Sequence, residues 1–212
     1  MLNKIFNKLF YETKFSYKRV IIFAILSAFF TALFLVLPFT IHTSLANIGV
    51  YLESWILFAL IIILNSEKPL EAAIKTFIFF LISQPLIYLL QVPFSFLGWQ
   101  IFMYYPRWFV MTLLVIPGAY IAWYIKKDNV FSSIILSIAT SYLVIQGTDF
   151  LCSTLDHFPK NLLSFIYCYV MAYLFINVFL HTKRNKIIAY IITTLALLFG
   201  IYRYVFLMGF AF

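Results

Sequence analysis

The sequence predicts an all-α polytopic membrane protein with about seven transmembrane helices in one bundle, and three observations support this fold class. The 212-residue chain is 65% hydrophobic and only 10% charged, whereas soluble domains are about 45–50% apolar and about 25% charged. Its mean hydropathy is +1.01. Seven apolar stretches, with most charged residues between them, each approach the roughly 20 residues that a helix needs to cross a bilayer.

The predicted spans follow one another with short connections, which leaves no room for a separate soluble domain. Their bounds lie near residues 20–41, 48–65, 72–92, 108–125, 129–148, 162–181 and 187–208. We therefore predict a single transmembrane bundle over residues 19–212, preceded by a short segment, 1–18.

The first 18 residues have the pattern of an amphipathic helix. Apolar residues recur at helical spacing, and Lys and Asn fill the opposite face. This pattern predicts an interfacial helix on the cytoplasmic leaflet. A cleaved signal peptide is the alternative, because Ser44–Ala46 resembles a cleavage site, although the apolar run before it is longer than such peptides usually have.

Lys and Arg residues divide unequally between the two sides of this topology. With a cytoplasmic N-terminus, twelve lie on the cytoplasmic side and three, Arg107, Lys160 and Arg203, on the outer side. Because cytoplasmic loops carry such an excess, we predict a cell-membrane protein with its N-terminus in the cytoplasm and its C-terminus outside. The net charge of +8 then favours anionic lipid headgroups at the cytoplasmic face as partners, and not nucleic acid.

The stretch NSEKPLEAAIKTF, residues 65–77, carries four charges between two apolar runs. Ser66 is a candidate N-cap, and Pro69 suits the first helical turn, where no N–H is needed. Glu71 precedes Lys75 by four residues, the favourable order for an ion pair on one helix face. We interpret the stretch as a capped helix start, with an inner gate or a docking surface for another membrane subunit as the alternatives.

Charged and aromatic residues also gather on the predicted outer side. Glu53 and Arg203 lie inside spans, each about 8 Å from the outer end at about 1.5 Å per residue. Ionisable groups at such positions usually pair or line a polar cavity, so one hypothesis is an ion pair of Glu53 with Arg203 or Arg107. The other is an outward-open cavity that binds a small solute, with the candidate substrate-binding residues Glu53, Trp99, Arg107, Asp149, Asp156, His157 and Arg203.

Prolines interrupt three predicted spans. They are Pro38, Pro85 beside Gln84, and Pro117 beside Gly118. Each removes a backbone hydrogen bond, and broken helices often build transporter sites near the membrane midplane. We treat these positions as candidate helix breaks, with a simple kink as the alternative.

Residues 93–106 form an uncharged segment that is too short to span a membrane and contains Pro93, Gly98 and Pro106. This composition predicts an interfacial or re-entrant segment on the outer side. Aromatic residues such as Trp99 at this level indicate either an interfacial belt or a stacking cage for a ring or a cation.

Small residues recur in the first span. Ala24, Ala28 and Ala32 are spaced by four residues, and small residues at this spacing let two helices approach closely. The stripe is therefore predicted to pack inside the bundle or to dock another membrane subunit.

Enzyme signatures such as H-E-x-x-H, G-x-S-x-G and a P-loop are absent from the sequence. Cys152, His157 and Asp149 could form a thiol site, and Asp149, Asp156 and His157 a metal site, but we predict no catalytic residues, no metal and no cofactor. The leading hypothesis is a protein that binds or transports a small solute from an outward-facing polar cavity. The rivals are an intramembrane enzyme acting on lipid or peptide, and a non-catalytic subunit of a membrane complex.

Overall fold

The computed structural model describes residues 10, 13, 15–37, 40, 43–50, 52–156 and 161–208. Every element of secondary structure in these ranges is a helix, and seven helical segments are long and apolar enough to cross a membrane. The prediction of an all-α chain with seven candidate spans is confirmed to this extent, and membrane insertion stays a prediction. Pro38, His157 and most of the predicted amphipathic segment 1–18 lie outside the described residues.

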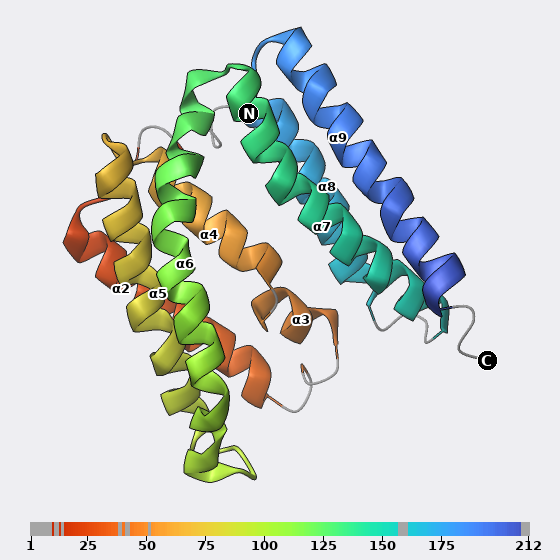
Figure 1. The fold of residues 1–212 in the computed structure, drawn as a ribbon. Coiled ribbons are helices and arrows are strands. Elements are labelled where there is room, and N and C mark those ends of the chain that lie inside the picture. The colour runs from red at the N-terminus through yellow and green to blue at the C-terminus, as the bar shows by residue number, and fades with distance from the viewer. Residues whose placement is uncertain are drawn as a thin grey trace. The chain divides into compact units, whose positions relative to one another are not determined.

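The main helices are labelled in Figure 1. They are α2 (Tyr17–Val36), α3 (Ser44–Val50), α4 (Leu52–Leu64), α5 (Pro69–Gln91), α6 (Tyr105–Ala122), α7 (Val130–Asp156), α8 (Leu162–Phe179) and α9 (Lys183–Tyr202). Two 3₁₀ helices, η2 (Gly98–Tyr104) and η3 (Trp123–Lys127), flank α6, and α9 continues into a π-helix, η4 (Arg203–Met208).

The residues group into two compact units. Unit 1 comprises Met1–Ile41 and Gly49–Trp123, and unit 2 comprises His42–Ile48 and Tyr124–Phe212. Each unit has its own helix packing, and the single bundle predicted over residues 19–212 stays a prediction. In each unit we call the end that carries most of its Lys and Arg residues the basic end, which is the end predicted to face the cytoplasm. We call the other end the opposite end.

In unit 1, α2 and α5 run parallel and pack closely along their length. Tyr17 lies against Lys75 near the basic end. One to two turns further along the two helices, Phe23 stacks on Phe79 with 5.2 Å between ring centroids. The core of unit 1 forms around this contact and contains Val20, Ala24, Ala28, Trp55, Ile62, Phe79 and Ile87.

The alanine stripe lies inside unit 1. Ala24 and Ala28 are fully buried and Ala32 is 4% exposed, and the first two belong to the same core cluster as Phe79 of α5. Side chains of this size let α2 approach the aromatic residues of α5 closely. Of the two alternatives for the stripe, its burial favours packing within the fold.

In unit 2, α7 packs along both α8 and α9, and Figure 1 shows α9 beside α7 over most of its length. Asp128, just before α7, accepts hydrogen bonds from the N–H and the hydroxyl of Thr182, just before α9, at 2.9 and 2.8 Å. In the middle of the pair, the hydroxyls of Thr140 and Thr193 are 2.8 Å apart. These contacts come in the same order along both helices, so α7 and α9 are parallel.

The structure corrects the prediction of helix breaks at two of the three prolines. The helix α5 continues through Gln84 and Pro85, and α6 continues through Pro117 and Gly118. A proline removes only one N–H donor, and the neighbouring helical hydrogen bonds are enough to keep each helix continuous.

The segment 93–106 is only partly irregular. After a turn, Gly98 begins the 3₁₀ helix η2, which leads directly into α6. Gly98 has a φ of +51°, a left-handed conformation that glycine adopts without steric cost. The fourth candidate span therefore begins at Gly98, ten residues earlier than the sequence predicted.

Candidate functional site

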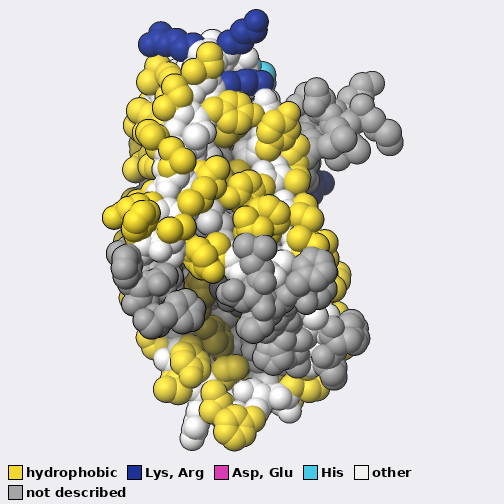
Figure 2. Space-filling model, turned by 90° about the vertical axis from the view of Figure 1, so that its right-hand side faces the viewer, with side chains coloured by type: hydrophobic (Ala, Val, Ile, Leu, Met, Phe, Trp, Pro, Cys, Tyr) yellow, Lys and Arg dark blue, Asp and Glu magenta, His cyan; other side chains and the backbone are white. Residues whose placement is uncertain are grey.

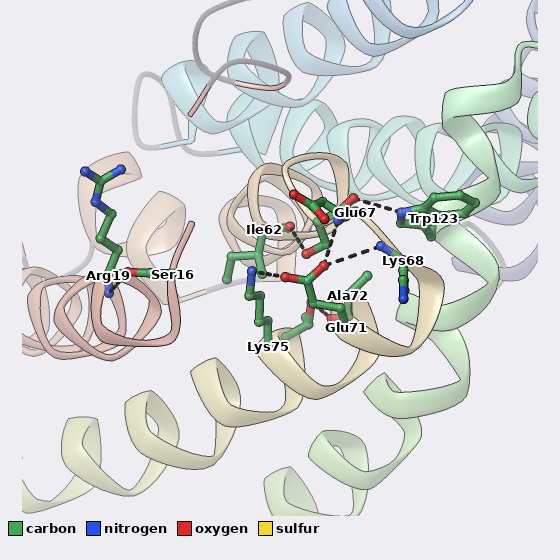
Figure 3. Close-up of polar contacts among 11 residues, drawn as sticks. Ser16, Arg19, Ile62, Glu67, Lys68, Glu71, Ala72, Lys75 and Trp123 are labelled. Atoms are coloured by element: carbon green, nitrogen blue, oxygen red, sulfur yellow. Dashed lines mark hydrogen bonds and ion pairs between the residues drawn. The ribbon is translucent and has the colours of Figure 1, made fainter. Parts of the chain in front are cut away.

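The charged turn at residues 65–77 is an ordered helix start at the basic end of unit 1 (Figure 3). The carboxylate of Glu71 accepts hydrogen bonds from the backbone N–H groups of Glu67 and Lys68 at 2.8 and 3.4 Å. It also forms the predicted ion pair with Lys75, one turn along α5. These contacts satisfy donors that a helix N-terminus otherwise leaves without partners, which supports the interpretation of a capped helix start.

Ser66 has a different role from the predicted one. The N-cap of α5 is Lys68, and the hydroxyl of Ser66 donates to the carbonyl of Ile62 at 2.8 Å, at the end of α4. The carbonyl of Ser66 accepts a hydrogen bond of 2.9 Å from the indole Nε1 of Trp123. This turn therefore joins the ends of α4, α5 and α6.

Lys75 is buried although it carries a charge. The residue is 5% exposed, and its Nζ lies 5.4 Å from the centroid of the Tyr17 ring on α2. Its ammonium is thus held between a carboxylate on its own helix and an aromatic ring on the neighbouring helix. The arrangement fixes α2 against α5 and leaves the Lys75 ammonium little access to a ligand.

At the opposite end of unit 1, the predicted site residues do not share one environment. Glu53 is almost completely buried, at 1% exposed, in the first turn of α4. Arg107 is exposed in the first turn of α6. Trp99 is 69% exposed and stacks on Phe102, with ring centroids 6.0 Å apart. The proposed ion pair between Glu53 and Arg107 is not formed among the described side chains.

Two predicted site residues do come together, in unit 2. Arg203 at the end of α9 forms an ion pair with Asp149 of α7. The parallel packing of α7 and α9 positions both side chains. Gly200 lies at this packing contact, where a Cβ would be in ordinary van der Waals contact with Thr148, 3.4 Å from its Oγ1. The hypothesis that joined Arg203 to Glu53 is therefore corrected: the partner of Arg203 is an acid of its own unit.

Polar groups surround this pair on α7 and α8. The hydroxyls of Thr148 and Tyr169 are 3.1 Å apart, so α8 contributes a polar group at the level of Asp149. Cys152, one turn along α7 from Asp149, is buried, at 8% exposed. Asp149 and Arg203, with Thr148 and Tyr169 beside them, thus form a polar cluster at the opposite end of unit 2.

The guanidinium of Arg203 has more donors than Asp149 uses. Arginine presents five N–H donors in a planar fork, and Nη2 donates to Asp149 Oδ1. Its Nε is buried and has no acceptor among the described residues. The two side chains are 32% and 36% exposed. The pair is therefore accessible, and the Nε–H is one of the guanidinium donors left for a further acceptor.

The backbone at Arg203 is also unusual, because the π-helix η4 begins at this residue. π-Helices are rare and frequently occur at functional sites. The sequence contains no recognised signal for this feature, so it could not be predicted together with the candidate residues.

A second polar network at this end of unit 2 was missed by sequence reasoning. The side-chain amide of Asn47 donates to Asn161 Oδ1, and Asn161 Nδ2 donates to Ser153 Oγ, both at 2.7 Å. Two asparagines next to predicted spans were the available signal, since polar side chains at membrane depth usually pair. Asp156 is the last residue of α7, and His157 lies outside the described residues.

Among the described residues, no group of three or more His, Cys, Asp or Glu side chains could hold a metal ion. Both cysteines are buried, and neither forms a disulfide within the described residues. The chain matches no protein-family model, and neither curated proteins nor solved structures show significant similarity to it. The candidate site is therefore argued from its own residues, and its centre is the pair Asp149–Arg203.

Proposed function

We propose that this protein is a multi-pass protein of the cell membrane that binds a small solute with an anionic group at Arg203 and transports it from the outside. The observation that carries the proposal is the accessible Arg203–Asp149 pair with a buried Nε that lacks an acceptor. A planar guanidinium binds carboxylate and phosphate groups through two parallel hydrogen bonds. A carboxylate or phosphate of the solute matches this geometry.

In this proposal Asp149 is the internal competitor of the solute. An accessible ion pair contributes only about 0–1 kcal/mol of stability, so a solute anion can replace Asp149 on Arg203 at small cost. Asp149 uses one N–H of the guanidinium, whereas a solute anion that accepts two parallel hydrogen bonds makes one more charge-assisted bond, worth about 1.5–3 kcal/mol. This additional bond favours exchange, and Asp149 is then available for a cationic group of the same solute.

Thermal unfolding of the purified protein in detergent tests this exchange. The compounds to screen are monocarboxylates, dicarboxylates, amino acids and phosphate monoesters, with neutral sugars as controls. We expect at least one anionic compound to raise the melting temperature of the wild type. Arg203→Gln should weaken its binding about 10- to 100-fold, and Arg203→Lys should retain part of it, because the charge remains and the fork is lost.

The variant Asp149→Asn separates binding from a structural role. If Asp149 competes with the solute, this variant lowers the melting temperature without ligand but binds the anion up to about fivefold more tightly. A purely structural pair predicts that Arg203→Gln and Asp149→Asn lower stability while no anionic compound stabilises any variant. That result would overturn the proposal and favour a non-catalytic subunit of a membrane complex.

The proposal also requires the pair to face outside, with the N-terminus in the cytoplasm. In a background of Cys152→Ser and Cys168→Ser, a membrane-impermeant thiol reagent added to intact cells should label Ser153→Cys but not Lys183→Cys. The reverse labelling pattern would contradict the orientation, and a stabilising solute should slow labelling of Ser153→Cys.

A further inference from the structure

The outward face of α9 carries a shallow apolar groove of about 340 Å³. It is lined by Ile187, Tyr190, Ile191, Thr194 and Leu195. These residues are spaced by three or four along the sequence, so they lie on one face of the helix. Its large side chains are exposed, from 36% for Tyr190 to 60% for Leu195, so the other described helices of unit 2 do not cover this face.

Two cations lie directly at the basic end of this groove. Lys183 and Arg184 precede Ile187 by four and three residues, so their side chains project from the same helix face. Both are exposed. Figure 2 shows Lys and Arg side chains gathered at one end of the molecule, above a flank covered by hydrophobic side chains.

The neighbouring polar groups are already engaged elsewhere. The Nζ of Lys186 donates to the carbonyl of Asn177 at 3.2 Å, so this lysine is bound to the end of α8. The amide of Asn177 donates to the hydroxyl of Tyr190 at 2.6 Å, which fixes one wall of the groove. Lys186 and Asn177 are thus held by contacts within unit 2, and Lys183 and Arg184 are the exposed cations beside the groove.

The size of the groove favours one acyl chain as its occupant. From Ile187 to Leu195 the helix rises about 12 Å at about 1.5 Å per residue. One leaflet contributes about 15 Å of the roughly 30 Å hydrocarbon core. The groove therefore matches a chain of a single leaflet, and the two exposed cations beside it favour a lipid with an anionic headgroup over a second apolar transmembrane helix.

We propose that this face of α9 is a binding site for one anionic phospholipid, with its phosphate on Lys183 and Arg184 and an acyl chain along the groove. Arginine binds phosphate oxygens through its planar fork, and lysine adds a second positive charge. The apolar lining accepts the chain that the phosphate positions. The inference is independent of the proposed solute site, which lies at the other end of unit 2.

Native mass spectrometry of the full chain in a non-ionic detergent, titrated with phosphatidylglycerol or phosphatidylcholine, tests the proposal. We expect one phosphatidylglycerol to bind on the order of 10-fold more tightly than phosphatidylcholine, because two basic side chains act on its charge. The double variant Lys183→Gln, Arg184→Gln should lose this preference. The control Lys18→Gln, Lys68→Gln removes two exposed basic residues of unit 1 and should retain it.

A second variant tests the acyl-chain part. Leu195→Trp fills the groove without changing charge and should weaken phosphatidylglycerol binding, while competition by inorganic phosphate should be weak for all variants.

Unchanged lipid preference in the Lys183, Arg184 double variant would overturn the proposal, as would equal loss in the unit 1 control. A dimer that added phosphatidylglycerol does not disrupt would identify a second copy as the occupant and also overturn it. Arg203→Gln should leave lipid binding unchanged, which separates this test from that of the solute site.

Discussion

The helix pair α2–α5 of unit 1 and the helix pair α7–α9 of unit 2 have the same parallel arrangement but different interactions. In the first, small side chains such as Ala28 pack against the aromatic residues around Phe79. In the second, Asp128 binds Thr182 at one end, Thr140 binds Thr193 in the middle, and Asp149 pairs with Arg203 at the other end.

The difference shows two ways to hold membrane helices together when the burial of apolar surface contributes little to their association. Between helices in lipid there is no hydrophobic driving force, so association depends on close packing and on interhelical hydrogen bonds. The pair α2–α5 relies mainly on shape, and α7–α9 relies on polar contacts at three levels. Substitutions that change volume should therefore act mainly on the first pair, and substitutions that remove hydroxyls or charges mainly on the second.

The largest expected effect is that of Ala28→Leu in unit 1. Ala28 is fully buried, and added methylene groups in a packed core typically cost about 1–3 kcal/mol. We expect a clear drop in the melting temperature in detergent. The matched control is Leu26→Ala on the exposed face of the same helix, which should have little effect. Equal effects of the two substitutions would contradict the packing that we describe for α2.

A smaller effect is expected for the hydroxyl pair in unit 2. Thr140→Val and Thr193→Val each remove one partner of the buried hydrogen bond, while side-chain volume is almost retained. A double-mutant cycle from unfolding measurements should give a coupling free energy of about 0.6 kcal/mol, the average for such bonds in membrane proteins. A coupling near zero would remove the main distinction between the two helix pairs.

The smallest effect concerns Asp128 and appears only in acid. Partial burial would raise the pKa of Asp128, but hydrogen bonds from Asn185 and Thr182 outweigh it and hold the pKa below the ordinary value of 3.8. Because the folded-state pKa is depressed, the contribution of the carboxylate is complete above the ordinary pKa and is lost as the pH falls through the folded-state value.

Melting temperatures measured from pH 6 down to about pH 2.5 check this dependence. Asp128→Asn should remove the part of the acid destabilisation that comes from this contact, so its stability should vary less with pH below about 4. Glu67→Gln, which changes an exposed acid in unit 1, should leave the acid limb as in the wild type. If both variants behaved alike, the contact at the start of α9 would not be the cause.

The candidate site was predicted only in part, and the reason is physical. Sequence reasoning identified Asp149 and Arg203 because ionisable groups near membrane spans usually pair or line a cavity. One hypothesis offered Arg203 or Arg107 as the partner of Glu53, because matched depth and opposite sign do not tell which helices are neighbours. Thr148 and Tyr169 were missed, since a threonine or a tyrosine within a span is common and becomes informative only when two helices bring them together.

The sequence by itself determined the all-helical architecture, the seven candidate spans and the ion pair Glu71–Lys75. These follow from hydrophobicity over about 20 residues and from four-residue spacing on one helix, both of which are local along the chain. Only the tertiary structure decided that α5 continues through Pro85, that Ala28 is inside unit 1 and that Asp149 is the partner of Arg203. The continuity of α5 depends on the helical hydrogen bonds that remain around the one N–H that Pro85 lacks. The burial of Ala28 and the pairing of Asp149 with Arg203 depend on which helix faces lie against each other, and residue spacing within a single helix does not encode this.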